Sequence, residues 1–245
     1  MLPRRACENR EPAFRPTRWS VIARASKNPG TDAEAFAELY GAYAFPLYAF
    51  VRRKGHDADQ ASDVVQEFFV ELLDGSLLRA ADQNKGRFRS YLLGALKHFL
   101  SNQHDRERAK KRGGGTLKLS LDDAERRYGL EPAHDATPER LFERQWAMTV
   151  LDHVMDQLTA EYQRAGKHQV FHQLKDLLAG PLADRSYAQI AAELDISEGA
   201  VKVAVHRLRH RYREILISHI AQTVEDEAEV EDEIRHLYAA ISGSA

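Results

Sequence analysis

Basic side chains gather in two segments of the chain, and they are the groups best suited to do chemistry. Between Lys85 and Arg112 there are nine lysines and arginines against two acidic residues, and between Ser197 and Arg213 there are five against one. Lysine and arginine neutralise phosphates, which is the chemistry of a surface that binds a polyanion. The net charge of −2 argues weakly against a nucleic-acid binder, but seven acidic residues lie together in Glu225–Glu233. Blocks of opposite sign predict two polyanion-binding surfaces and an acidic tail.

The second basic segment lies inside a pattern that predicts a helix-turn-helix. Ser186 and Gln189 have the spacing of a capping box, so a short helix is expected to begin there. Asp195 tolerates the left-handed backbone of a sharp turn, and Ser197 can cap the helix that follows. The expected inner faces are Tyr187, Ile190, Ala191, Leu194, Ile196, Val201, Val205, Leu208 and Tyr212. The second helix would present cations to a DNA major groove or, alternatively, belong to an ordinary helical hairpin with a solvated basic face.

The residues from Tyr187 to Arg209 resemble the second conserved region of the extracytoplasmic-function sigma factors, a branch of the sigma-70 family. In that family the region binds the upstream promoter element and the flap of the polymerase β subunit. The resemblance implies an upstream-element surface made of Ser197, Glu198, Lys202, Val203, His206, Arg207, Arg209 and Arg211. The chain departs from the family at Val203 and Ala204, where Ser-Arg is common, so no promoter preference is implied.

Three amphipathic helices are expected to position the first basic segment. The first begins with a capping box at Thr31–Glu34, and Pro46 inside it predicts a kink or a break. Asp57 can cap the second helix, in which apolar residues recur at spacings of three and four until Gly75. The third runs from about Phe88 into the basic residues.

Two stretches of this first half also resemble the sigma factors. Residues 57–72 resemble the helix that docks on the clamp coiled coil of the polymerase β′ subunit, and the matching polar positions are Asp59, Asp63, Gln66 and Glu67. On periodicity alone, these residues would be the solvated face of a bundle helix. Residues 86–102 resemble the segment that grips the downstream promoter element and traps a flipped base in the preceding loop.

That second resemblance assigns candidate contacts to opened DNA. The candidates for the loop and its edge are Asn84, Lys85, Arg87, Phe88 and Arg89, and those for phosphates are Lys97, Arg106, Arg108, Lys110, Lys111 and Arg112. Stacking is worth about 1–3 kcal/mol per base, which offsets an unpairing cost of a few kcal/mol. Packing in the core is the alternative for Phe88 and for Tyr91.

An all-α protein is predicted, with two small helical domains joined by a flexible linker. Gly113–Gly115 and the mixed pattern to about Ala136 indicate the linker, and Thr137-Pro138 begins a long helix. The expected parts are an arm at 1–18, a domain similar to sigma region 2 at 19–112, the linker at 113–136, a domain similar to sigma region 4 at 137–217, and an acidic tail with a short helix at 218–245.

Composition and the motifs that are missing argue against several other classes. Cys7 is the single cysteine, so no internal disulfide can form and a reducing cytoplasm is expected. No stretch approaches the roughly 20 apolar residues that span a bilayer, so no membrane partner is predicted. His168 and His172 have metal-ligand spacing, but no third ligand is evident. No phosphate loop or nucleophile motif indicates an enzyme, and neither a cofactor nor a metal is expected.

The predicted partners are therefore core RNA polymerase, through its β′ clamp and β flap, and promoter DNA, with an anti-sigma factor as a further candidate. The alternative is a stand-alone helix-turn-helix regulator, which would bind paired half-sites as a dimer. The acidic tail is an addition to the family's minimal pattern, with an apolar helix around Ile234–Ile241. It could fold over a basic surface such as the recognition helix and regulate the protein, or it could simply make the chain more soluble.

Overall fold

The computed structural model describes residues 19–27, 31–82, 85–107, 123–130, 136–180, 185–224 and 226–243, without the side chains of residues 103–107 and 227. All regular structure in these ranges is helical, which confirms the predicted all-α class. No helix within these ranges is long and apolar enough to cross a membrane.

Five helices pack around a common core that we call the first lobe. They are α1 (Trp19–Lys27), α2 (Ala33–Arg53), α3 (Ala58–Leu73), α4 (Ser76–Ala80) and α5 (Phe88–Glu107). The apolar stripes of α2 and α3 meet in this core, where Phe50, Phe68 and Phe69 are fully buried. Phe68 also meets Phe99 of α5 edge to face, with ring centres 5.6 Å apart. Aromatic packing thus fixes the position of α5, which carries the first basic segment.

The start of α2 differs from the expected capping box. Asp32 caps the helix, because its carboxylate accepts a hydrogen bond from the Ala35 amide at 2.9 Å. Arg24 of α1 pairs with Asp32 at 2.9 Å and with Glu34 at 3.1 Å. Since Glu34 is engaged by Arg24, the predicted box at Thr31–Glu34 is wrong, and the cap lies one residue later.

The next boundaries follow local sequence signals. Helix α2 runs through the buried Pro46 without ending, so a break there is wrong. Asp57 caps α3 as predicted: the Gln60 amide donates to its carboxylate at 2.8 Å, and the Gln60 side chain accepts from the Asp57 amide. Gly75 follows α3 with φ of 76°, a left-handed conformation that glycine adopts without a Cβ clash. The chain can therefore turn directly into α4.

A further helix, α6 (Ala124–Gly129), lies where the sequence predicts a flexible linker. Glu125 accepts a hydrogen bond from the Tyr48 hydroxyl at 2.6 Å and pairs with Arg52 at 2.7 Å. The guanidinium of Arg127 lies 3.9 Å from the centre of the Phe45 ring. Residues 123–130 are thus packed against α2, which corrects the expectation for this part of the linker. Residues 113–122 and 131–135, like the predicted arm at 1–18, lie outside the described residues.

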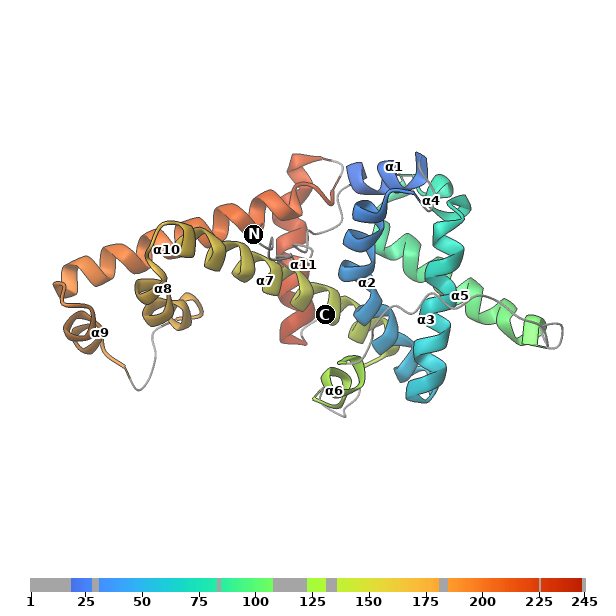
Figure 1. Cartoon of the computed structure of the whole chain (residues 1–245), viewed down its shortest axis with the longest axis horizontal. Coiled ribbons are helices and arrows are strands. Elements are labelled where there is room, and N and C mark those ends of the chain that lie inside the picture. The colour runs from blue at the N-terminus through green and yellow to red at the C-terminus, as the bar shows by residue number, and fades with distance from the viewer. Residues whose placement is uncertain are drawn as a thin grey trace, which may run out of the picture.

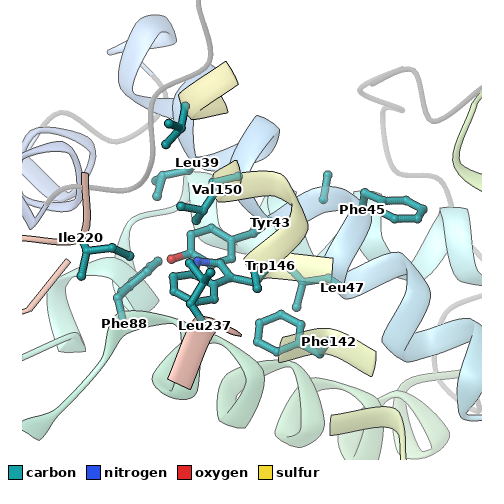
Figure 2. Close-up of a cluster of buried hydrophobic side chains, with 14 of the residues drawn as sticks. Leu39, Tyr43, Phe45, Leu47, Phe88, Phe142, Trp146, Val150, Ile220 and Leu237 are labelled. Atoms are coloured by element: carbon teal, nitrogen blue, oxygen red, sulfur yellow. The ribbon is translucent and has the colours of Figure 1, made fainter. Parts of the chain in front are cut away.

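Helix α7 (Pro138–Arg164) begins at its predicted cap, where the Thr137 hydroxyl accepts a hydrogen bond from the Arg140 amide at 3.2 Å. Its first half packs on α2: Figure 2 shows Phe142 and Trp146 in one cluster with Tyr43. The other half of α7 contacts α8 (His168–Leu174) and α10 (Glu198–Ile220). The two predicted domains are therefore joined by a continuous core as well as by the chain, an arrangement that the sequence did not indicate.

The part of the chain beyond α7 forms a second lobe with the helix-turn-helix. Its elements are α8, the 3-10 helix η2 (Lys175–Leu178), α9 (Tyr187–Leu194) and α10. Ser186 and Gln189 make the predicted capping box, and Asp195 adopts the left-handed conformation, with φ of 52°. Ser197 caps α10 by accepting a hydrogen bond from the Ala200 amide at 3.1 Å. Ile196 corrects one expectation, because it is 39% exposed in the turn.

The chain then returns to the middle of the molecule. After the short 3-10 helix η3 (Glu227–Glu229), α11 (Val230–Ser242) lies against α7 and α10. Figure 1 shows α11 crossing the molecule between the helix-turn-helix end and the first lobe. The predicted tail helix therefore exists and begins a turn before the expected Ile234.

Candidate nucleic-acid interface

The outer face of α10 carries exposed basic and polar side chains of the helix-turn-helix. Lys202, His206 and Arg207 lie opposite the buried stripe that packs against α9. Lys202 pairs with Glu198, one turn earlier, at 2.8 Å. Both partners are exposed, so this ion pair contributes little to stability and can be exchanged for a phosphate contact. Val203, half exposed between these cations, adds an apolar surface. We call this set the upstream face: Ser197, Glu198, Lys202, Val203, His206 and Arg207.

Two predicted members of the upstream surface are engaged in holding the second lobe together. Arg209 donates to the carbonyl oxygen of Leu177 from two nitrogens, at 3.1 and 2.6 Å. Arg211 pairs with Glu161 of α7 at 2.7 Å and with Glu214 at 3.0 Å. These contacts anchor α10 to η2 and α7, so Arg209 and Arg211 have a structural role that the sequence did not indicate, and their predicted contact with DNA stays a prediction.

The predicted strand-binding edge of α5 is largely buried. Phe88 packs edge to face against Trp19 and Tyr43, with ring centres 5.9 and 5.6 Å away. It is therefore a core residue, which was the alternative weighed for it. Arg89 is 2% exposed and lies with its guanidinium 3.9 Å from the centre of the Trp146 ring. The assignment of Phe88 to DNA is therefore wrong, and Arg89 cannot meet DNA while α7 and α11 stay in place.

Arg89 is held by two carboxylates from distant parts of the chain. Its Nε donates to Glu143 of α7 at 2.7 Å, and its Nη1 donates to Glu233 of α11. Arg87 pairs with the other oxygen of Glu233 at 2.8 Å and is partly exposed. We call this group the Arg89 cluster: Arg87, Arg89, Glu143, Trp146 and Glu233.

The electrostatics of the cluster keep Arg89 charged. Burial lowers the pKa of Arg89, but the attraction of Glu143 and Glu233 outweighs it and holds the pKa above its usual value. Removing one partner of a buried ion pair costs about 3–5 kcal/mol, because an uncompensated charge is left in the interior. The cluster is therefore stable only while α5, α7 and α11 stay together.

The remaining basic positions near α5 are more open. Lys97 is partly exposed and pairs with Glu139 of α7 at 2.7 Å. This hydrogen bond lowers the pKa of Glu139. Lys85 lies 3.6 Å from Asp82 and is mostly exposed. Asn84, Arg108, Lys110, Lys111, Arg112 and the side chain of Arg106 lie outside the described residues.

One groove of about 450 Å³ runs along the outer side of α5. It is lined by Glu71, Leu77, Tyr91, Gly94, Ala95, His98, Phe99 and Asn102. Tyr91 is half buried and donates its hydroxyl proton to the Leu77 carbonyl at 2.7 Å, so its position at the edge of the groove is fixed. An aromatic ring beside polar side chains can stack on a base and bond to its edge.

The polar face of α3 is available to a partner. Asp59, Asp63 and Glu67 are exposed, whereas Gln66 is half buried and donates to the Ser62 hydroxyl at 3.0 Å. Asp63 and Glu67 line a groove of about 840 Å³, together with Gln60, Lys97 and Glu139 among others. The groove combines carboxylates with the apolar surface of Val64 and Leu100, a composition suited to a protein partner.

The described ranges contain no group of three or more histidine, cysteine, aspartate or glutamate side chains that could hold a metal ion.

The sequence did not predict Glu143, Trp146 and Glu233 as partners of the basic segment. A signal for Glu233 was present, because it stands on the same helical stripe as Val230 and Leu237, at spacings of three and four. A carboxylate on an apolar stripe indicates a buried ion pair.

Comparison with known proteins agrees with these features. Residues 39–110, which span α3 and α5, match the family model described as sigma-70 region 2. This match supports the resemblance to the extracytoplasmic-function sigma factors and a role in transcription initiation. The chain is 22% identical over 215 residues to the ECF RNA polymerase sigma factor SigE of Mycolicibacterium smegmatis. The aligned region covers 88% of this chain and 74% of that relative. No solved structure matches the chain.

Proposed function

We propose that the chain binds core RNA polymerase through α3, reads an upstream promoter element with α10, and holds the opened downstream element along α5. The observation that carries this proposal is the order of the parts: a match to sigma-70 region 2 is followed by a helix-turn-helix with an exposed cationic face. A stand-alone regulator would need the second part but not the first.

Polymerase binding is assigned to the exposed side of α3. Asp59, Asp63 and Glu67 project from a helix whose opposite stripe is locked into the core, so they can pair with a basic partner without disturbing the fold. The groove beside them would take the partner's apolar side chains. The β′ clamp is the partner proposed for this face, and the β flap is proposed for the second lobe.

Upstream DNA is assigned to the upstream face of α10. A helix that follows a sharp turn enters the major groove with its N-terminal residues toward the base edges. Lys202 and Arg207 would neutralise phosphates or bond to base edges, and His206 would add a further donor. The N-terminus of α10, with Ser197 as its cap, presents backbone amides to a phosphate.

Opened DNA is assigned to the basic edge of α5. Lys85, Arg87 and Lys97 supply positive charge there, and the groove beside Tyr91 offers a surface on which a base can stack. Arg89 would join them once α11 leaves α5 and its Glu233 no longer pairs with the arginines. Phe88 is left out of this assignment because it is a core residue.

Binding to purified core RNA polymerase tests the proposal. A fluorophore on Cys7 would report binding by anisotropy, and we expect tight, saturable 1:1 binding. Asp63→Ala and Glu67→Ala should each weaken binding several-fold, whereas Asp74→Ala, an exposed carboxylate at the end of the same helix, should not. If the labelled chain does not bind polymerase but binds paired half-sites as a dimer, it is a stand-alone regulator.

A further inference from the structure

Glu233 differs from every neighbouring carboxylate of the acidic tail that the structure describes. Glu231 and Asp232 are about two-thirds exposed, as expected of a solubilising segment. Glu233 is fully buried and binds both Arg87 and Arg89 at the start of α5. Burying a carboxylate is costly unless it is paired, so this residue is placed by specific contacts rather than by solvation.

Helix α11 is seated along its whole length. Leu237 is buried beside Trp146 and Phe88, as Figure 2 shows. His236 lies 3.3 Å from Glu143 of α7, and Arg140 donates to the carbonyl oxygen of Gly243 at 2.8 Å. These contacts hold the middle and the C-terminal end of α11 against α7, while Glu233 ties its N-terminal part to α5. The acidic tail thus ends in a docked element.

The groups that α11 covers are those of the proposed strand-binding edge. Guanidinium groups bind carboxylates and phosphates with the same fork of N–H donors. Glu233 therefore offers Arg87 and Arg89 the contacts that a phosphate of an unpaired strand would offer. Glu143 and Glu139 of α7 complete the pattern, because they occupy Arg89 and Lys97.

We propose that α11 is an internal substitute for the unpaired promoter strand. In the free chain its Glu233 occupies Arg87 and Arg89, and α11 must leave its seat on α7 and α5 before this surface takes single-stranded DNA. This inference rests on the proposed function, and it identifies the ligand of the covered surface as a single-stranded nucleic acid.

The chemistry of the cluster suits a reversible contact. A buried ion-pair network contributes little net stability compared with apolar packing, but it depends strongly on every partner being present. A polyanion can replace Glu233 without leaving the arginines unpaired. The apparent DNA affinity is then the intrinsic affinity multiplied by the fraction of molecules in which α11 is undocked. A change that weakens the docked state raises this fraction and therefore the affinity.

The first experiment compares two matched variants of the full chain. Glu233→Gln removes the buried anion, and Glu231→Gln makes the same change of charge on the exposed side of α11, where Glu231 pairs with the exposed Arg213. Binding of a fluorescent single-stranded DNA oligonucleotide is measured for each, alone and in complex with core polymerase. We expect Glu233→Gln to bind at least about fivefold more tightly than the wild type, and Glu231→Gln to match the wild type. Equal affinity for all three proteins would overturn the proposal.

The second experiment does not depend on a buried substitution. Arg140→Cys and Ser242→Cys, in a Cys7→Ser background, are joined by a flexible bismaleimide that ties α11 to α7. A control joins Arg24→Cys to Glu34→Cys, an exposed pair that links α1 to α2. We expect the α11 cross-link to abolish promoter opening by the polymerase complex and the control cross-link to leave it intact. Opening by both cross-linked proteins would overturn the proposal.

The same proteins separate this inference from the function on which it depends. The cysteine variants without the cross-linker must bind core polymerase and open the promoter. If they do not, the proposed function fails, whatever the cross-link does. If they do and the α11 cross-link changes nothing, the function stands and the role of α11 is wrong.

Discussion

Arg209 of α10 donates two hydrogen bonds to the carbonyl oxygen of Leu177, while Arg207, two residues earlier, points its charge to solvent. Two arginines in one basic run thus serve different purposes. Arg209 ties α10 to η2, and the exposed Arg207 is the residue proposed to contact DNA.

This difference predicts that two alanine substitutions affect different properties, DNA affinity for Arg207 and stability for Arg209. Arg207→Ala should weaken binding to upstream-element DNA by roughly 1–3 kcal/mol if the side chain bonds to a base edge. If it contacts a phosphate instead, the slope of log affinity against log salt concentration should fall by about one. Its thermal stability and polymerase affinity should stay unchanged. Arg209→Ala should instead lower the free energy of unfolding by about 1 kcal/mol, because charged donors are lost from a carbonyl. Calorimetry with DNA-binding titrations checks both, and equal loss of polymerase binding in Arg207→Ala would contradict the assignment.

Val203 predicts a preference for thymine methyl groups. Its side chain is half exposed on the upstream face, between cations that would hold the helix in the groove. An apolar side chain in the major groove contacts the C5-methyl group of thymine. Replacing single thymines of the upstream element by uracil should therefore weaken wild-type binding several-fold at one position. The Val203→Ser variant, which replaces the apolar side chain by a polar one, should lose that sensitivity. If wild type and variant lose the same affinity on uracil substitution, Val203 does not contact the thymine.

Acidification should loosen two contacts between elements. Hydrogen bonds from Arg52 and Tyr48 lower the pKa of Glu125, and a hydrogen bond from Arg211 lowers the pKa of Glu161. A carboxyl group with a lowered pKa in the folded state stabilises the fold above its unfolded pKa, and this stabilisation is lost as the pH falls.

The melting temperature should accordingly drop between about pH 5 and pH 3, by a modest amount because both carboxylates are partly exposed. A Glu125→Gln/Glu161→Gln variant should be less stable than the wild type at pH 7. The difference should shrink toward zero at low pH. Parallel curves for the two proteins would show that these carboxylates do not set the pH dependence.

The shared core predicts that the chain unfolds as one unit. Phe142 of α7 is fully buried among residues of α2, so Phe142→Ala should destabilise by about 3–5 kcal/mol. If this contact couples the unfolding of the two lobes, the Phe142→Ala protein should show one calorimetric transition, at a lower temperature than the wild type. Met148→Ala, on the exposed side of the same helix, is the control. Two separate transitions in the wild type would instead support independent domains.

Local signals predicted the fold better than they predicted the partners of charged groups. The capping boxes at Asp57 and Ser186 and the left-handed Asp195 depend on neighbouring residues, so they can be found from spacing alone. Helix α6 has no apolar period of useful length, and polar contacts with α2, more than 70 residues earlier, hold it in place.

The sequence predicted the basic residues of the candidate site but not the acidic residues that pair with them. The composition around Arg89 indicates binding to a polyanion, and nothing local reveals that the anions are Glu143 and Glu233, 54 and 144 residues away. The same limit applies to Arg211, whose partner Glu161 comes from another helix. The sequence locates the basic residues, whereas the fold decides which of them are accessible.

Helix α7, with its 27 residues, spans about 40 Å between the first lobe and the helix-turn-helix. Helix α10 packs along α7, so the connection between the two lobes is a supported helix rather than a flexible linker. A rod of that length corresponds to about twelve base pairs of B-form DNA at 3.4 Å each. If α7 keeps this position when both proposed DNA-binding surfaces are occupied, the distance between them is set by helical rise rather than by the reach of a loose linker.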